Sequence, residues 1–172
     1  MGHKIKRLAL ICSLTVMGSM LVPATASSRS ADNACWEYTS AEKRFKRKIN
    51  DERVGEALGK LKLDPELSKV ARKHTKEMLQ ADKGLFHTTS EQFNKRITNW
   101  NLVGENVGYG GGVNSLHEAF MDSPPHAQNV LTAAFVYVGI GARRDEDGTM
   151  WVTIIFEATN NPGTTLPMPS CG

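Results

Sequence analysis

Residues 102–130 read LVGENVGYGGGVNSLHEAFMDSPPHAQNV, and they follow a short Phe86-His87-Thr88 triplet. Three side chains from these two segments suit one shared cleft: His87, Glu105 and His126. They lie too far apart in the chain for one helix turn to hold them, so only a folded scaffold can bring them together. We therefore interpret most of the remaining chain as that scaffold.

The first 26 residues are typical of a secretory signal peptide. Three cations lie within the first seven residues, an apolar run extends from Leu8 to Val22, and Ala24-Thr25-Ala26 is a small-residue cleavage site. The apolar run is about 15 residues, shorter than the roughly 20 that a spanning helix needs. We expect residues 1–26 to be removed and the protein to be secreted, with an extracellular location.

Charge argues against a nucleic-acid partner. The whole chain has 21 Lys and Arg against 18 Asp and Glu, and the three cations of the leader account for the entire excess. The remaining chain is neutral, which excludes a globally basic nucleic-acid binder. One basic run remains at 43–48, and we interpret it as the solvated face of a helix. The alternative is weak contact with anionic surfaces.

Two cysteines remain after the leader, Cys35 and Cys171, one near each end of the chain. An even pair in an exported protein favours a disulfide. In the chain-entropy model, closing so long a loop would stabilise the fold by up to about 5 kcal/mol. The alternative is two unpaired thiols.

Periodicity and capping residues predict five helices and one hairpin, in an α+β domain. Apolar spacing and caps indicate helices at 39–54, 65–82, 91–97, 113–122 and 126–131. Strands at 134–142 and 150–158 alternate in polarity around a turn at 145–148, which makes a β-hairpin. Because an isolated hairpin does not stay folded, a third strand and flanking helices must cover it. The expected divisions are a signal peptide at 1–26, an extension at 27–38, the domain at 39–158 and an irregular tail at 159–172.

Several side chains are assigned by their place in these patterns. His74 lies on the inner stripe of the second helix, so we expect a satisfied core histidine. Ala119 is expected to face inward beside Leu116 and Phe120. His117 has no histidine four residues later, so we reject a zinc-protease helix and expect His117 on the helix surface.

The glycines at 108–112 invite a phosphate-loop interpretation, which we reject. No convincing buried strand precedes them, and no Lys-Ser/Thr pair follows. We expect a flexible rim of the cleft instead.

Glu105 and Asn106 are flanked by apolar residues, which makes them informative. A carboxylate and an amide in such a setting are costly unless hydrogen bonds satisfy them. They either tie neighbouring loops together or face a ligand.

These motifs, in this order, resemble the CAP superfamily, also called SCP domains. The residues that carry the resemblance are Phe86-His87-Thr88, Gly104-Glu105-Asn106, the Phe120-to-His126 segment, Val138-Gly139-Ile140-Gly141 and the strand after Val152. The resemblance spans about 40–157 and favours the bacterial branch. It implies an α-β-α sandwich with a small antiparallel sheet between helical layers and a central cleft.

The family's cleft has two histidines and two acids, which map here onto His87, Glu105 and His126 with one gap. The second acid would align with Ser123. The expected ligand cleft therefore consists of His87, Glu105, Asn106, Ser123 and His126, with no catalytic residue assigned. His87 and His126 are the candidate metal ligands, and zinc is the candidate metal.

Two functions follow from this cleft. The first is a secreted, non-enzymatic module that binds a divalent metal or a small-molecule, lipid or peptide ligand. The second is a metal-assisted hydrolase of the peptidase kind, with Glu105 as general base and His87 and His126 beside it. A single carboxylate favours binding, since acid–base catalysis needs two differently tuned groups. A Ser123–His126–Glu105 triad has little support, because no Gly-x-Ser-x-Gly elbow is present.

Overall fold

The computed structural model describes residues 35–81 and 83–170. The expected signal peptide at 1–26 and Cys171, the expected partner of Cys35, lie outside the described residues. Both therefore remain predictions.

The helices confirm most of the predicted bounds and caps. Thr39 begins α1 with a capping box in which its side chain accepts from the Glu42 N–H. Asp64 begins α2 by accepting from the N–H groups of Glu66 and Leu67. The five helices are α1 (Ser40–Gly55), α2 (Pro65–Gln80), α3 (Ser90–Arg96), α4 (Val113–Asp122) and α5 (Pro124–Leu131).

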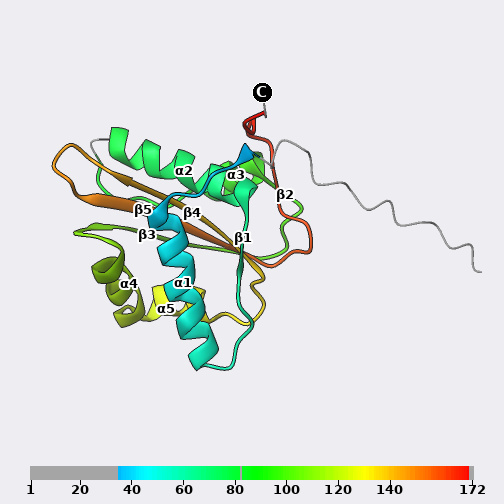
Figure 1. The fold of residues 1–172 in the computed structure, drawn as a ribbon. Helices are drawn as coiled ribbons and strands as arrows, with labels where there is room; N and C mark the ends of the chain where they lie inside the picture. Colours follow the sequence, from blue (N-terminus) through cyan, green and yellow to red (C-terminus); the bar gives the residue numbers. More distant parts are fainter. Residues whose placement is uncertain (1–34, 82, 171–172) are drawn as a thin grey trace, which may run out of the picture.

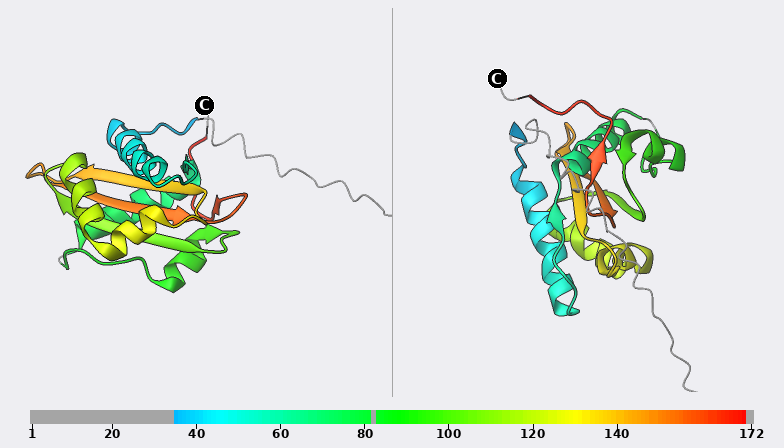
Figure 2. Two further views of the ribbon diagram at one scale, coloured as in Figure 1. Left: turned by 90° about the horizontal axis from the view of Figure 1, so that it is seen from below. Right: turned by 90° about the vertical axis from the view of Figure 1, so that its right-hand side faces the viewer.

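A four-stranded sheet with the order β1-β4-β5-β3 lies between two layers of helices. Its pairs are antiparallel except that the short β1 runs parallel to β4. The strands are β1 (Lys62–Leu63), β3 (Val103–Gly110), β4 (Tyr137–Arg144) and β5 (Met150–Glu157). Figure 1 shows α2 and α3 over one face and α4 and α5 below the other, with α1 descending beside them, and Figure 2 shows the same layers from two further sides. The expected α-β-α sandwich is confirmed.

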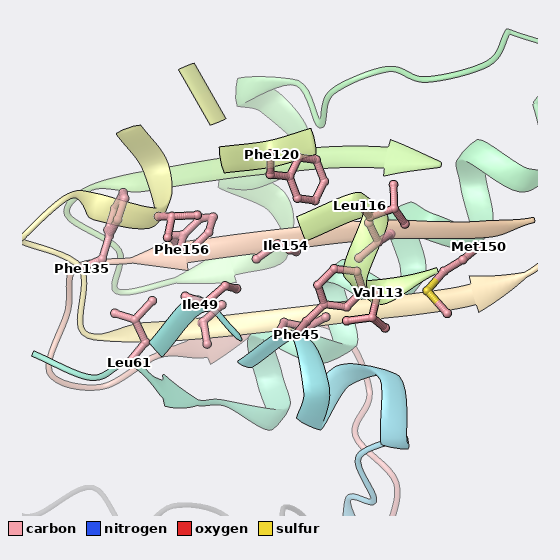
Figure 3. Close-up of a cluster of buried hydrophobic side chains, with 14 residues drawn as sticks. Phe45, Ile49, Leu61, Val113, Leu116, Phe120, Phe135, Met150, Ile154 and Phe156 are labelled. Carbon is pink, nitrogen blue, oxygen red and sulfur yellow. The ribbon is translucent and has the colours of Figure 1, made fainter. Parts of the chain in front are cut away.

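Each face of the sheet has its own apolar core. On the face covered by α1, α4 and α5, fourteen residues are buried together, among them Phe45, Phe120 and Ile154 (Figure 3). On the other face, α2 packs Leu67 and Val70 against strand residues and α3. Because successive strand residues point to opposite faces, β4 and β5 contribute to both cores.

Two glycines let α2 lie directly on β4. A Cβ added at Gly139 would lie 2.3 Å from the backbone carbon of Leu67, and one at Gly141 would lie 2.3 Å from the Arg72 nitrogen. No side chain fits in that space, so the Val138-Gly139-Ile140-Gly141 motif sets the distance between helix and sheet.

Several expectations were wrong. The glycine-rich segment is not a flexible rim: Gly108 and Gly110 belong to β3, the third strand that the hairpin requires. The tail after Thr159 is not wholly irregular, because β6 (Gly163–Thr164) pairs with β2 (Ile97–Thr98).

Two further expectations, both for residues of α4, were also wrong. Ala119 is exposed rather than inward. His117 is 2% exposed rather than on the surface, and its Nε2 lies 3.0 Å from Glu52 Oε1 on α1. Glu52 on the neighbouring helix gives the buried Nε2 of His117 a polar partner, as buried polar groups require.

Candidate functional site

The site is built on β3, which is an edge strand of the sheet. Its consecutive residues Glu105 and Asn106 point to opposite faces, as strand geometry requires. Glu105 therefore meets the loop that follows α2, and Asn106 meets α5. The candidate site therefore draws on residues from both faces of the sheet at its edge.

Glu105 is held by three hydrogen bonds. Its Oε1 accepts from the backbone N–H of Thr88 at 2.9 Å and lies 2.9 Å from His87 Nδ1, while its Oε2 accepts from the Thr88 hydroxyl at 2.6 Å. The carboxyl group is nearly buried, at 8% exposure of the residue, whereas the His87 side chain is 59% exposed. Glu105 thus fixes the His87 ring from behind and leaves its outer face to solvent.

The loop that carries His87 is anchored to α2 by His74. This residue is 0% exposed, and its Nε2 lies 2.8 Å from the carbonyl oxygen of Phe86, whose ring it also meets edge-on at 5.1 Å. The predicted core position of this histidine is confirmed, but it is only half satisfied: its Nδ1 has no hydrogen-bond partner among the described residues and lies 3.6 Å from Glu77 Oε2. His74 positions the residue immediately before His87 without facing the cleft.

Asn106 ties β3 to α5. Its side-chain amide donates to the carbonyl oxygen of His126 at 3.0 Å and accepts from Asn129 at 2.8 Å. Asn129 also donates to the backbone carbonyl of Glu105 at 3.1 Å. Asn106 is 0% exposed, so its contacts hold the backbone rather than a ligand.

His126 lies on the α5 side of the cleft. Its Nδ1 lies 2.8 Å from the Ser123 hydroxyl, and its ring packs against Phe120 at 5.2 Å between centroids. Burial lowers the pKa of His126 below its ordinary 6.5, and electrostatic repulsion from His87 lowers it further. The charge of His87 thus acts on His126. The lowered pKa keeps His126 neutral at pH 7.

Sequence reasoning missed Thr88, Asn129 and Gly104 as parts of this site. A Cβ at Gly104 would lie 2.7 Å from Asn129 Oδ1, which explains the glycine before Glu105. One signal was present: Asn129 follows His126 by three residues and so shares its helix face.

The described residues contain no group of three or more His, Cys, Asp or Glu side chains arranged to hold a metal ion. The hydrolase triad does not form either, because the hydrogen bonds of Glu105 go to His87 and Thr88 rather than to His126. The two candidate ligands, His87 and His126, each have their Nδ1 beside a polar neighbour, Glu105 and Ser123 respectively.

The chain thus combines an α-β-α sandwich with a hydrogen-bonded histidine–glutamate pair at the edge of its sheet. Residues 46–156 match the cysteine-rich secretory protein (CAP) family, and the chain belongs to it. The chain is 29% identical over 138 residues to the uncharacterized protein YkwD of Bacillus subtilis. That alignment covers 75% of this chain and 52% of YkwD, so the chain spans about half of its relative.

Solved structures confirm the fold. An outer surface protein of Borrelia burgdorferi is similar with a TM-score of 0.63 and 20% identity, over 69% of this chain and 92% of that one. An extracellular SCP-domain protein of Bacillus anthracis has a TM-score of 0.60 and 20% identity, over 69% and 40%. The structure of NaASP2 with Zn²⁺ has a TM-score of 0.52 and 12% identity, over 76% and 86%.

Proposed function

We propose that this chain is an exported, non-enzymatic binding module whose cleft binds a divalent metal through His87 and His126. The observation that carries the proposal is the state of the two rings. Each has its Nδ1 beside a polar partner, Glu105 for His87 and Ser123 for His126. For each, the outward-facing ligand atom is then Nε2, the usual donor of a neutral imidazole to zinc.

The carboxylate behind His87 supports metal binding. A metal-bound histidine generally donates its other ring N–H to a carboxylate or carbonyl, which fixes the tautomer and raises the basicity of the ring. Glu105 stands in that position at 2.9 Å. Its role is to orient a ligand rather than to be one.

Two histidines fit an open site. Zinc in proteins is usually four-coordinate, so solvent or a bound molecule would complete the shell. We therefore expect weak affinity, and we expect a small-molecule, lipid or peptide ligand with an acidic group to supply further donors. A similar fold has been solved with Zn²⁺, in NaASP2.

Hydrolysis is less supported than binding. A general base needs an oxygen that faces the substrate, whereas both oxygens of Glu105 already accept hydrogen bonds within the protein.

Export rests on the leader at 1–26 and on relatives described as extracellular or outer-surface proteins. No helix among the described residues is long and apolar enough to cross a membrane.

Calorimetric titration with zinc at pH 7 tests the metal site. The protein used is the chain from Ser27 onward, which contains every described residue. We expect one-to-one binding that weakens at least about tenfold in His87→Ala and in His126→Ala, and that also weakens below about pH 6 as protons compete with the metal.

The matched control is His117→Gln, which removes a histidine outside the cleft and keeps a hydrogen-bonding side chain near Glu52. It should bind as the wild type does. Unchanged zinc binding in both single cleft variants would refute the shared site.

A further inference from the structure

A second hollow lies at the opposite end of α4 from the histidine cleft. It has a volume of about 690 Å³ and lies between the first turns of α1 and α4 and the end of the β4–β5 hairpin. Helix α4 has 10 residues and is therefore roughly 15 Å long, and His126 follows its far end on α5. The hollow is therefore distinct from the cleft.

The charge of this hollow is one-sided. Three arginines line it, Arg44 from α1 and Arg143 and Arg144 from β4, and no aspartate or glutamate is among its lining residues. Acids of the hairpin turn, 145–147, line a neighbouring hollow together with Arg143 and Arg144. No ion pair joins them to either arginine within the described part of the chain.

The three arginine side chains differ in how many hydrogen bonds they make within the protein. Arg144 donates to the carbonyl oxygen of Gly111 at 3.3 Å and to that of Gly148. The side chains of Arg44 and Arg143 make no hydrogen bond or ion pair with any residue that the structure describes, and both residues are exposed. Their guanidinium groups keep all their donors for a ligand.

Helix α4 adds donors to the same hollow. Its N-cap is Gly112, which makes no side-chain cap, and Asn114 and Ser115 of its first turn line the hollow. The first N–H groups of a helix have no partner within the helix and carry partial positive charge. These N–H groups add hydrogen-bond donors and partial positive charge to those of the arginines.

We propose that this hollow binds a phosphate monoester. A dianionic phosphate matches two guanidinium groups, each of which bonds oxygens in a bidentate manner. The volume exceeds that of a bare phosphate and falls in the range of small-molecule sites. Ala41, Ala142 and Met150 supply apolar surface for the organic part of the ester.

The ester has two possible sources, a soluble metabolite or a lipid headgroup, and two probes distinguish them. Glycerol 3-phosphate is titrated by calorimetry, and vesicles of phosphatidylcholine with phosphatidic acid are used in co-sedimentation. The variants are Arg44→Gln and Arg143→Gln. Arg47→Gln is the matched control, because it removes the same charge from the same helix but lies at a different hollow.

We expect saturable binding that falls at least about tenfold in Arg44→Gln and in Arg143→Gln, and that changes less than about twofold in Arg47→Gln. Binding of glycerol 3-phosphate indicates a soluble ester, whereas binding of vesicles alone with the same pattern of variants indicates a headgroup. Equal weakening by Arg44→Gln and Arg47→Gln would mean unspecific attraction to the basic helix and would overturn the site. So would the absence of binding to both probes.

Discussion

Two buried glutamates on the same face of the sheet have opposite surroundings. Glu105 on β3 accepts three hydrogen bonds from His87 and Thr88. Glu157 on β5 is 0% exposed, and neither of its oxygens has a hydrogen-bond partner among the described residues. Burial, the largest cause, and the nearby carboxylates of Asp64 and Glu66 together raise the pKa of Glu157 to about 8.

The difference shows that burial alone does not define a functional carboxylate. Around Glu105, the loop residues His87 and Thr88 satisfy the carboxylate, and the exposed His87 lies between it and solvent. Around Glu157 no described residue hydrogen-bonds the buried carboxyl group, so at neutral pH the folded protein keeps this side chain protonated. The first carboxylate is stabilised by its neighbours, whereas the second lowers stability at high pH.

The largest expected effect comes from removing the satisfied carboxylate. We expect Glu105→Ala to lower the free energy of unfolding by about 3 kcal/mol, because Thr88 keeps two buried donors without an acceptor. Urea denaturation measures this loss. Glu105→Gln retains an acceptor oxygen and should lose about half as much. An alanine variant within about 0.5 kcal/mol of the wild type would show that the network does not stabilise the fold.

A smaller effect is expected at Glu157, and it depends on pH. The unfolded chain releases this proton near pH 4.3, whereas the folded protein keeps it until about pH 8. Rising pH between these values therefore favours the unfolded chain. We expect Glu157→Gln to remove a loss of about 2 kcal/mol between pH 5 and pH 6.5.

Urea denaturation across this pH range measures the effect. The control is Glu91→Gln, which changes an exposed glutamate paired with Lys95 and should follow the wild-type profile. A Glu157→Gln variant with the wild-type pH dependence would contradict the assignment.

The smallest effect concerns the cleft histidines. His87→Ala removes the repulsion that helps to lower the pKa of His126, so this pKa should rise but stay below 6.5, since burial persists. Because folding lowers this pKa, the stability linked to His126 is lost as the pH falls below about 6.5, and the variant should lose less. A titration of the ring protons by NMR gives the value directly. An unshifted His126 would place the two rings in separate environments.

The helices were predictable from the sequence because their signals are local. Thr39 and Asp64 are caps, Pro65 fits a first turn, and the apolar spacing of 113–122 gave the bounds of α4. The β4–β5 hairpin was predictable for the same reason. These elements, with the resemblance, were sufficient for the fold.

Strand β3 was not predictable in this way. Its sequence VGENVGYG has glycines and polar residues where a strand normally carries apolar ones. The glycines leave room for Asn129 and for side chains of α4. The polar residues Glu105 and Asn106 make hydrogen bonds to the His87 loop and to α5. His117 was misplaced since its partner Glu52 is far away in the sequence. Long-range pairing of this kind leaves no local pattern, and the orphan state of Glu157 was invisible for the same reason.

The position of the cleft on an edge strand has a consequence for solubility. A free strand edge offers unpaired backbone groups to other chains and invites strand addition. Here the carbonyl of Glu105 is occupied by Asn129. Helix α5 and the His87 loop flank the same edge, one from each side of the sheet. We therefore expect the residues around Glu105 also to hinder the addition of another strand at this part of β3.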